Sequence, residues 1–326
     1  MDAGLKRELE AKVYAGERLT RSDGITLQES DDLAWLGRLA HHKRTEIGGD
    51  RTLFAVNRRL DLANADDVAG RAEATAGAEE TKDDQVTEVH IVNAVHSGRS
   101  WHSYPETLRA LGAALPGVGF RGFSASDIRE LEKISGLPAG EVLDELMSAG
   151  LESLAGDGAE IAGAGWEDWS RIHRLAHGKG MKTPASVLYR PGEARVDPIV
   201  RLRELQDETG GFAVFIPLRE SAEGRAAAPA ETLKTFAVAR LMFDNVPHIQ
   251  SSTGTHDRSV AQLALNFGAD EFDGSNDTLQ RDDLLDLIWD AGFRPVERNT
   301  QYEVVRAYDA APSFTDRRSE PQQVWA

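Results

Sequence analysis

The sequence predicts an α/β fold, a TIM-like (β/α) barrel of parallel strands that follows an N-terminal helical extension. From residue 53 onward, short β-rich runs alternate with helical stretches of about ten to fifteen residues, which is the pattern of βα units and a parallel sheet. About eight such runs can be counted, which suggests a closed or nearly closed barrel. The chain has 326 residues, enough to bury a large core.

Residues 1–50 are predicted to be an N-terminal helical segment. Apolar residues recur there on single helical faces, at Leu5, Leu9 and Val13, and again at Leu33, Leu36 and Leu39. Ser30 is the predicted N-cap of the later helix, and Gly48-Gly49-Asp50 breaks the helical pattern.

The barrel itself is predicted to span residues 51–311. Its strands are expected at residues 53–60, 88–95, 119–124, 151–155, 182–189, 211–217, 248–253 and 269–274. A typical barrel helix is predicted over 138–150, with Pro138 near position N1 and Gly150 at C′. A second capped amphipathic helix is expected at 283–289, before Gly292.

Three further segments follow from composition. Residues 302–305 are expected to form a final extended segment. Residues 63–86 carry only Val68 and Val86 as sizeable apolar side chains, so we expect this segment to be mobile or loosely docked. Residues 312–326 are polar and contain proline, which predicts a flexible tail.

Charge and composition exclude several classes of function. The formal net charge is −17 and the pI is about 5.0, so binding to nucleic acid or to an anionic membrane surface is not expected. Neither a signal peptide nor an apolar run long enough to span a membrane is found, which predicts a cytoplasmic protein. The expected partners are a small-molecule ligand or another protein, and a homo-oligomer is compatible with these counts.

The sequence contains no cysteine. Thiolate nucleophiles, cysteine-ligated zinc and cysteine-held iron–sulfur clusters are therefore excluded. No Walker, GxGxxG or GxSxG string occurs either, so the common phosphate-binding and serine-hydrolase motifs are absent.

Long strings of the sequence nevertheless resemble one family. They are VNRRL at 56–60, EVHIVN at 88–93, GDGAEI at 156–161, WEDWSRIHRLAH at 166–177, LRELQDETGGF at 202–212, FDNVPH at 243–248 and FRPVERNT at 293–300. In these strings the chain resembles the aminofutalosine (aminodeoxyfutalosine) synthases of menaquinone biosynthesis, from about Leu5 to Tyr308. That family belongs to the radical S-adenosylmethionine enzymes.

The resemblance implies a chemistry that this chain cannot support. The family holds a [4Fe–4S] cluster with three cysteines, spaced CxxxCxxC, in the loop after the first barrel strand. Here the approach to that loop survives as residues 60–64, but Ala65-Asp66-Asp67-Val68 stands where the first cysteine belongs. Carboxylates such as Asp66 and Asp67 are poor ligands for such a cluster. The parental radical transferase activity is therefore predicted to be absent.

Other departures from the family fall after predicted strands. The segments after Glu160, Tyr189 and Arg219 are shortened or simplified, and residues 251–256 replace a more apolar run. Loops after strands lie at the carboxyl face of a barrel, where active sites are built. The resemblance thus implies a retained scaffold with a rebuilt mouth.

Several polar residues at that mouth are candidates for a functional site. Asn93 and His96 lie where the family places backbone that binds the cofactor, and His96 could also act as a general base or be a solvated loop residue. Glu160 stands in the family's glycine string and could accept hydrogen bonds from a ribose or an amine, or be a loop carboxylate that accepts from nearby backbone N–H groups. Asp127 is either a ligand contact or a first-turn helix acid, with the helix role favoured.

Two further candidates are Arg219, which could bind a carboxylate or form a rim ion pair, and His256, a catalytic candidate in the rebuilt loop. His173 and His177 have zinc-ligand spacing but no glutamate after the first histidine, so a structural role is favoured. His90, inside a strand, is predicted to be packed. No metal site is predicted.

These residues lead to two main hypotheses. The favoured one is a non-radical pseudoenzyme that binds a ligand or partners a homologous synthase. The alternative is a cluster-free enzyme that performs polar chemistry on a nucleoside or an aromatic carboxylate. A divergent or artificial sequence without selected activity is a third possibility. No cofactor is predicted, although S-adenosylmethionine or an adenosine-like compound could be the ligand.

Anaerobic reconstitution with iron and sulfide should give no stoichiometric [4Fe–4S] absorbance, because the chain has no thiolate to hold the cluster. Incubation of the treated protein with a reductant and S-adenosylmethionine should release no 5′-deoxyadenosine. A site-bound cluster at one equivalent per chain would contradict the prediction.

Overall fold

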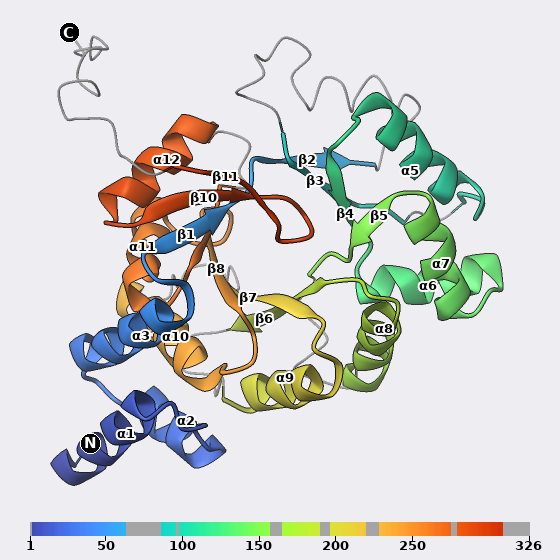
Figure 1. Ribbon diagram of the computed structural model, residues 1–326. Coiled ribbons are helices and arrows are strands. Elements are labelled where there is room, and N and C mark those ends of the chain that lie inside the picture. The colour runs from blue at the N-terminus through green and yellow to red at the C-terminus, as the bar shows by residue number, and fades with distance from the viewer. Residues whose placement is uncertain are drawn as a thin grey trace, which may run out of the picture.

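Three helices precede the first strand in the computed structural model, which describes residues 2–62, 86–95, 98–156, 165–189, 196–219, 228–274 and 279–308 (Figure 1). They are α1 (Ala3–Tyr14), α2 (Arg21–Gln28) and α3 (Leu33–Gly48). Asp2 caps α1, and Thr20 forms a capping box with Asp23 at the start of α2. The predicted N-cap of α3 was wrong. Asp32 caps that helix by accepting from the Trp35 N–H, and Ser30 instead accepts from the Asp32 N–H.

A buried arginine joins α3 to the sheet. The Arg44 guanidinium donates to the carbonyl oxygens of Ala269 and Arg51 at 2.9 and 2.7 Å, and to Thr52 Oγ1 at 2.7 Å. It also lies 3.7 Å from the centroid of the Phe293 ring. Burial, the largest influence, lowers the pKa of Arg44 to about 10. These contacts fix α3 against the strands.

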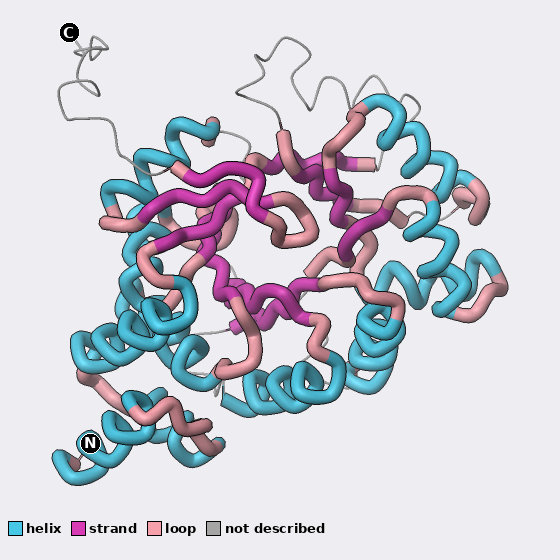
Figure 2. The backbone as a smooth tube through the Cα atoms, in the orientation of Figure 1, coloured by secondary structure: helices cyan, strands magenta, loops and turns pink. Residues whose placement is uncertain are grey.

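Every strand predicted from the sequence is present, and Figure 2 shows them as a ring of magenta segments surrounded by helices. The strands are β1 (Arg51–Phe54), β2 (Asn57–Asp61), β3 (Glu88–Val92), β4 (Gly119–Arg121), β5 (Leu151–Ser153), β6 (Thr183–Tyr189), β7 (Phe212–Arg219), β8 (His248–Ser252), β9 (Glu271–Asp273), β10 (Arg294–Arg298) and β11 (Val304–Ala307). The predicted run 53–60 is divided between β1 and β2, and β11 is the predicted final extended segment.

The strands form two hydrogen-bonded sheets. One has the order β11-β10-β1-β9-β8-β7-β6 and the other β2-β3-β4-β5; all pairings are parallel except the antiparallel β10–β11 pair. The short link from β1 to β2 carries the chain from one sheet to the other. The predicted α/β barrel fold is confirmed. In the described ranges no hydrogen-bonded ladder joins β5 to β6, so the strands do not form a closed ring of hydrogen bonds.

Helices cover the outside of the strands (Figure 1). They are α5 (Ser103–Ala114), α6 (Ala125–Ser135), α7 (Ala139–Ser148), α8 (Trp166–Gly178), α9 (Val196–Thr209), α10 (Pro229–Met242), α11 (Arg258–Ala264), the 3-10 turn η2 (Leu265–Phe267) and α12 (Arg281–Asp290). The predicted helix 138–150 is α7, although Pro138 is its N-cap rather than N1. Gly150 has a φ of 114° just past the C-cap, as predicted for C′.

Two segments predicted to be mobile or flexible, 63–86 and 312–326, lie mostly or wholly outside the described residues. Residues 63–85 and 309–326 lie outside the described residues, while Val86 is buried. No described helix is long and apolar enough to cross a membrane.

A layer of buried charges lies inside the barrel, with glutamates from the first residues of β3 and β9 and arginines from the last residues of β4 and β10. Arg298 Nη1 lies 2.8 Å from Glu88 Oε2, and Arg298 Nε lies 3.0 Å from Glu271 Oε1. Arg121 Nη2 reaches Glu88 Oε2 at 3.4 Å. All four side chains are buried. Burial alone would raise the pKa of Glu88, but the charges of Arg121 and Arg298 hold that pKa well below its usual range.

The turn between β10 and β11 packs against the first residues of β4 and β8, next to this layer. Tyr302 donates to Glu271 Oε2 at 3.1 Å and stacks on His248, the first residue of β8. Thr300 approaches the start of β4 so closely that a Cβ at Gly119 would lie 2.0 Å from Thr300 Oγ1. Glycine is therefore needed at that position.

Two histidines of α8 pack against β6 and α9. His173 Nδ1 and His177 Nε2 both contact Thr183 Oγ1 at 2.9 Å, and His177 Nδ1 contacts Thr209 Oγ1 at 2.7 Å. Burial lowers the pKa of His177 to about 4 and that of His173 well below its usual range. The described residues hold no group of three or more potential metal ligands. This geometry agrees with the structural role favoured for the pair.

Replacing Arg298 with Met should lower the free energy of unfolding by about 3–5 kcal/mol, because Glu88 and Glu271 would lose their shared cation inside the barrel. Urea unfolding followed by circular dichroism measures this. The control is Arg294→Met on the same strand, whose exposed pair with Asp50 should matter by no more than about 1 kcal/mol. Equal losses of unfolding free energy in the two variants would mean that the buried charge layer stabilises the fold no more than the exposed pair does, which would contradict the prediction.

Stability should also fall as the pH drops from about 6.5 towards 4. In that window the unfolded chain binds protons at His173 and His177 that the native state excludes, so the free energy of unfolding decreases with each step down in pH. Between pH 6.5 and 5, His177→Gln should remove up to about 2 kcal/mol of this decrease. The exposed His102→Gln should leave the slope unchanged, and a His177→Gln slope equal to that of the wild type would refute the assignment.

Candidate functional site

A cavity of about 230 Å³ opens above the buried charge layer, towards the carboxyl ends of the strands. This is the face on which barrel enzymes build their sites. Strands of both sheets contribute to it, and its lining is Arg59, His90, Ile91, Val92, Arg121, Ala155, Gly156, Pro184, Ile216, Leu218, Gln250, Ser252, Gly254, Thr255 and Asp273. We call it the mouth pocket. Its volume equals that of about eight water molecules, which suits a small ligand.

Two polar side chains in the lining have atoms without a partner. Arg121 and Gln250 are 5% and 4% exposed, and neither Arg121 Nε nor Gln250 Oε1 makes a hydrogen bond in the described structure. A buried polar atom without a partner costs roughly 1–3 kcal/mol. A ligand that offers an acceptor to Arg121 and a donor to Gln250 would remove this cost.

A carboxylate on the β9 side of the pocket is held in place. Asp273 Oδ1 accepts from Asn57 Nδ2 at 2.6 Å, and Asp273 Oδ2 accepts from Ser252 Oγ at 2.9 Å. Arg59, in contrast, lines the pocket with an exposed side chain and has no hydrogen bond or ion pair to any described residue. The pocket therefore offers a fixed acceptor and an available guanidinium.

His90 also faces the pocket, where the sequence predicted a packed side chain. Its side chain is 19% exposed, and Nε2 is hydrogen-bonded to Glu88 Oε1. The two residues are two apart in β3 and therefore share one face of the strand. The Glu-x-His spacing was the signal in the sequence that could have pointed to this pair.

The catalytic candidate His256 lies in the wall beside the pocket and does not line it. It is 5% exposed; Nε2 contacts the Tyr189 hydroxyl at 3.1 Å, and Nδ1 lies 2.9 Å from Thr255 Oγ1. Burial lowers the pKa of His256 to about 4, and the nearby charge of Arg219 opposes protonation further. Arg219 is the half-buried last residue of β7. Roles for both residues in ligand binding or catalysis stay predictions.

Asn93 and Asp127 make local contacts and do not line the pocket. Asn93 follows β3 with a φ of 48°, and its Nδ2 donates to Asp61 Oδ2 at 2.8 Å. Asp127 forms a capping box with Ser124 at the start of α6, which is the helix role that the sequence favoured. His96 and Glu160 lie outside the described residues.

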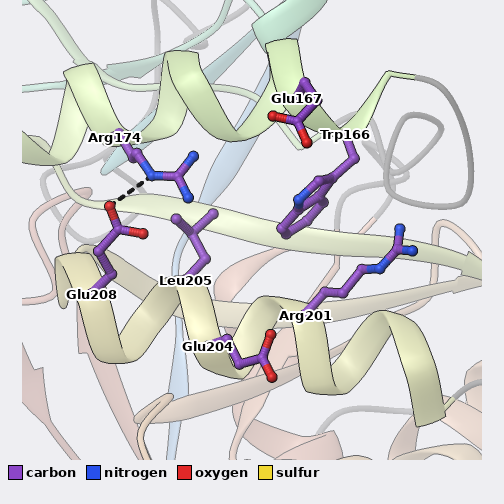
Figure 3. Close-up of a pocket in the computed structure, with 7 residues that line it drawn as sticks. All are labelled: Trp166, Glu167, Arg174, Arg201, Glu204, Leu205 and Glu208. Atoms are coloured by element: carbon purple, nitrogen blue, oxygen red, sulfur yellow. Dashed lines mark hydrogen bonds and ion pairs between the residues drawn. The ribbon is translucent and has the colours of Figure 1, made fainter.

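A second hollow lies on the outer surface between α8 and α9 (Figure 3). It measures about 580 Å³ and is lined by Trp166, Glu167, Arg174, Arg201, Glu204, Leu205 and Glu208. The ion pair between Arg174 Nε and Glu208 Oε1, 2.7 Å apart, crosses between the two helices (Figure 3). The hollow is lined by residues of α8 and α9 alone and its charges are of both signs, so the mouth pocket, which strands of both sheets line, is the better candidate site.

Comparisons with known proteins agree on one lineage. The family described as "CofH/MqnC C-terminal region" matches residues 213–310. Aminodeoxyfutalosine synthase from Streptomyces coelicolor is 49% identical over 385 residues, and the alignment covers 99% of each chain. The enzyme of the same name from Thermus thermophilus is 34% identical over 354 residues, covering 91% of this chain and 95% of the relative. Both alignments are longer than the 326 residues of this chain, so each relative has residues that this chain lacks.

Solved structures support the same fold. The FeFe-hydrogenase maturase HydG from Carboxydothermus hydrogenoformans aligns with a TM-score of 0.67 at 13% identity, over 91% of this chain and 80% of the maturase. Methylornithine synthase (PylB) aligns with a TM-score of 0.57 at 16% identity, over 81% and 85% of the two chains. At these identities the likeness concerns the fold alone.

The relatives found by sequence show the family as well as the fold. Their similarity extends over nearly the whole chain, and the sequence of this chain contains no cysteine. The chain therefore belongs to the aminodeoxyfutalosine synthase family of the radical S-adenosylmethionine superfamily, as a member without cysteine.

Proposed function

We propose that this protein binds a small polar ligand in the mouth pocket and performs no radical chemistry. The observation that carries the proposal is the pair of buried, unpartnered atoms, Arg121 Nε and Gln250 Oε1, in the pocket lining. Such atoms are costly to bury unless solvent or a ligand meets them. A pseudoenzyme that kept its pocket after losing its cluster fits this arrangement.

The residues of this chain do not fit a [4Fe–4S] cluster. Cluster irons take thiolate ligands, and the sequence has no cysteine. Asp66 and Asp67 supply hard oxygen ligands, which suit such a cluster poorly. No step of the proposed function therefore involves a cluster.

The ligand class follows from the pocket and the lineage. The volume of about 230 Å³ suits a single ring with a polar substituent, and Arg59 and Arg121 favour an acceptor or an anionic group. An aromatic carboxylate with one ring, such as benzoate, meets these conditions directly. A purine nucleobase or an adenosine-like compound is larger than one ring and would extend from the pocket towards the strand ends that surround its opening. S-adenosylmethionine is included because the chain belongs to a family of the radical S-adenosylmethionine superfamily.

A cluster-free enzyme is the second candidate function. The observation in its favour is His90, which faces the pocket while hydrogen-bonded to Glu88. A histidine held by a carboxylate is a common device for proton transfer. Polar chemistry on a nucleoside or an aromatic carboxylate needs no more than such a group and a pocket.

The proposal also covers the location and the partners of the protein. We infer a cytoplasmic location and an association with a homologous synthase or with a second copy of this chain. The net charge of −17 supports the choice of a protein or small-molecule partner over nucleic acid or an anionic membrane.

Isothermal titration with adenosine, benzoate and S-adenosylmethionine should detect binding of at least one of them. Gln250→Leu should weaken that binding by on the order of 5–100-fold, because the ligand loses a buried hydrogen-bond partner worth roughly 1–3 kcal/mol.

The matched control is Gln262→Leu on α11, whose side chain bonds to the Leu287 carbonyl oxygen outside the barrel. It should leave the affinity unchanged. Binding that is equal in Gln250→Leu and wild type would place the ligand elsewhere, and a folded wild type that binds none of the three compounds would contradict the proposed ligand class.

A further inference from the structure

Three neighbouring strands place a row of basic side chains along one wall of the mouth pocket. In the parallel register Arg59 of β2 is paired with His90 of β3, and His90 is paired with Arg121 of β4. Neighbouring strands of a sheet lie about 4.7–4.9 Å apart, and residues paired in parallel register point to the same face. All three line the pocket. The imidazole therefore stands between two guanidinium groups.

Glu88 fixes the state of the His90 ring. The Glu88 carboxyl is fully buried, and the Arg121 and Arg298 charges keep it ionised. An ionised carboxylate only accepts hydrogen bonds, so the contact between Glu88 Oε1 and His90 Nε2 requires the proton to be on Nε2. In the neutral ring the lone pair is then on Nδ1.

The other ring nitrogen is available to a ligand. No described residue makes a hydrogen bond to His90 Nδ1, and the side chain keeps 19% of its surface exposed in a residue that lines the pocket. Histidine is the side chain that ordinarily exchanges protons near neutral pH. A base with its lone pair open to a small cavity is therefore present.

The groups that face His90 complete the arrangement. Arg59 and Arg121 flank it from β2 and β4, Glu88 lies below it in β3, and Asp273 lies in the same lining on β9. A negative charge that forms on a bound ligand would meet Arg121 Nε–H and the Arg59 guanidinium, neither of which has a hydrogen-bond partner among the described residues. The imidazolium that forms at the same moment would be stabilised by Glu88.

We propose that His90, oriented by Glu88, is the acid–base group of the mouth pocket, and that it takes a proton from a small planar carbon or nitrogen acid whose resulting anion is held by Arg59 and Arg121. The proposal rests on the ligand-binding function proposed above. In the step, the bond from the ligand's carbon or nitrogen to hydrogen breaks. Its electron pair stays on the ligand, and the proton moves to Nδ1. The proton then returns to the product or to water, so no oxidant or reductant is needed.

The elimination of 5-nitrobenzisoxazole tests this step with a defined probe. His90 Nδ1 removes the proton on the carbon of the ring, the C–H electrons form the nitrile, the N–O bond breaks, and the coloured 2-cyano-4-nitrophenolate is released. Wild-type protein should accelerate this reaction above an equal concentration of imidazole. His90→Gln should lower kcat/KM by about 100-fold or more.

The matched control is His102→Gln, which removes an exposed histidine outside the pocket and should leave kcat/KM at the wild-type value. A His90→Gln rate equal to that of the wild type, or a wild-type rate no higher than that of imidazole, would overturn the proposal. Thermal unfolding of each variant shows whether it is folded under the assay conditions.

Histidine NMR spectra recorded without ligand test this inference separately from the proposed function. Long-range ¹H–¹⁵N spectra report the tautomer of each histidine, and the His90 signals are those absent from His90→Gln. We expect the Nε2–H tautomer at pH 8, with Nδ1 unprotonated. The Nδ1–H tautomer would overturn the assignment of His90 even if the titrations detect a ligand, whereas failed titrations with the expected tautomer would refute only the ligand class.

Discussion

The pocket depends on one interaction, the buried contact of Arg298 with Glu88 and Glu271. Two carboxylates inside a barrel repel each other and lose their hydration, so neither would stay ionised there without a shared cation. Arg298 supplies that cation from β10, and Arg121 supports Glu88 from the opposite side. The ionised state of Glu88 in turn sets the tautomer of His90 one layer higher. A stability element at the base of the barrel thus determines the chemistry available at its mouth.

The same layer explains how the family fold could persist after the cluster ligands were lost. The contacts that hold the barrel lie below the mouth, in Arg298 and the Tyr302 turn, or outside it, in Arg44 and the α8 histidines. None of them involves the segment after β2 where the family places its cysteines. A chain without cysteine can therefore keep these interactions, which stabilise the fold.

The two functional hypotheses share a pocket and differ in one residue. Binding requires the unpartnered atoms of Arg121 and Gln250, whereas catalysis requires in addition the open Nδ1 of His90. His256, the candidate nearest to the rebuilt loop after β8, has both ring nitrogens occupied and a depressed pKa. The geometry thus favours a strand residue of the scaffold over a residue of the rebuilt loop as the reactive group.

The sequence by itself determined the eight parallel strand runs, the N-terminal helices and the absence of a cysteine-held cluster, because periodicity, capping residues and composition are local properties of the chain. It did not predict β10, where only tertiary contacts bury Arg298 against a carboxylate 210 residues away. The sequence also predicts a packed His90, because that residue lies inside a strand. Its neighbours Arg59 and Arg121 come from separate strands, and the space in front of it exists only because those strands curve around a common interior.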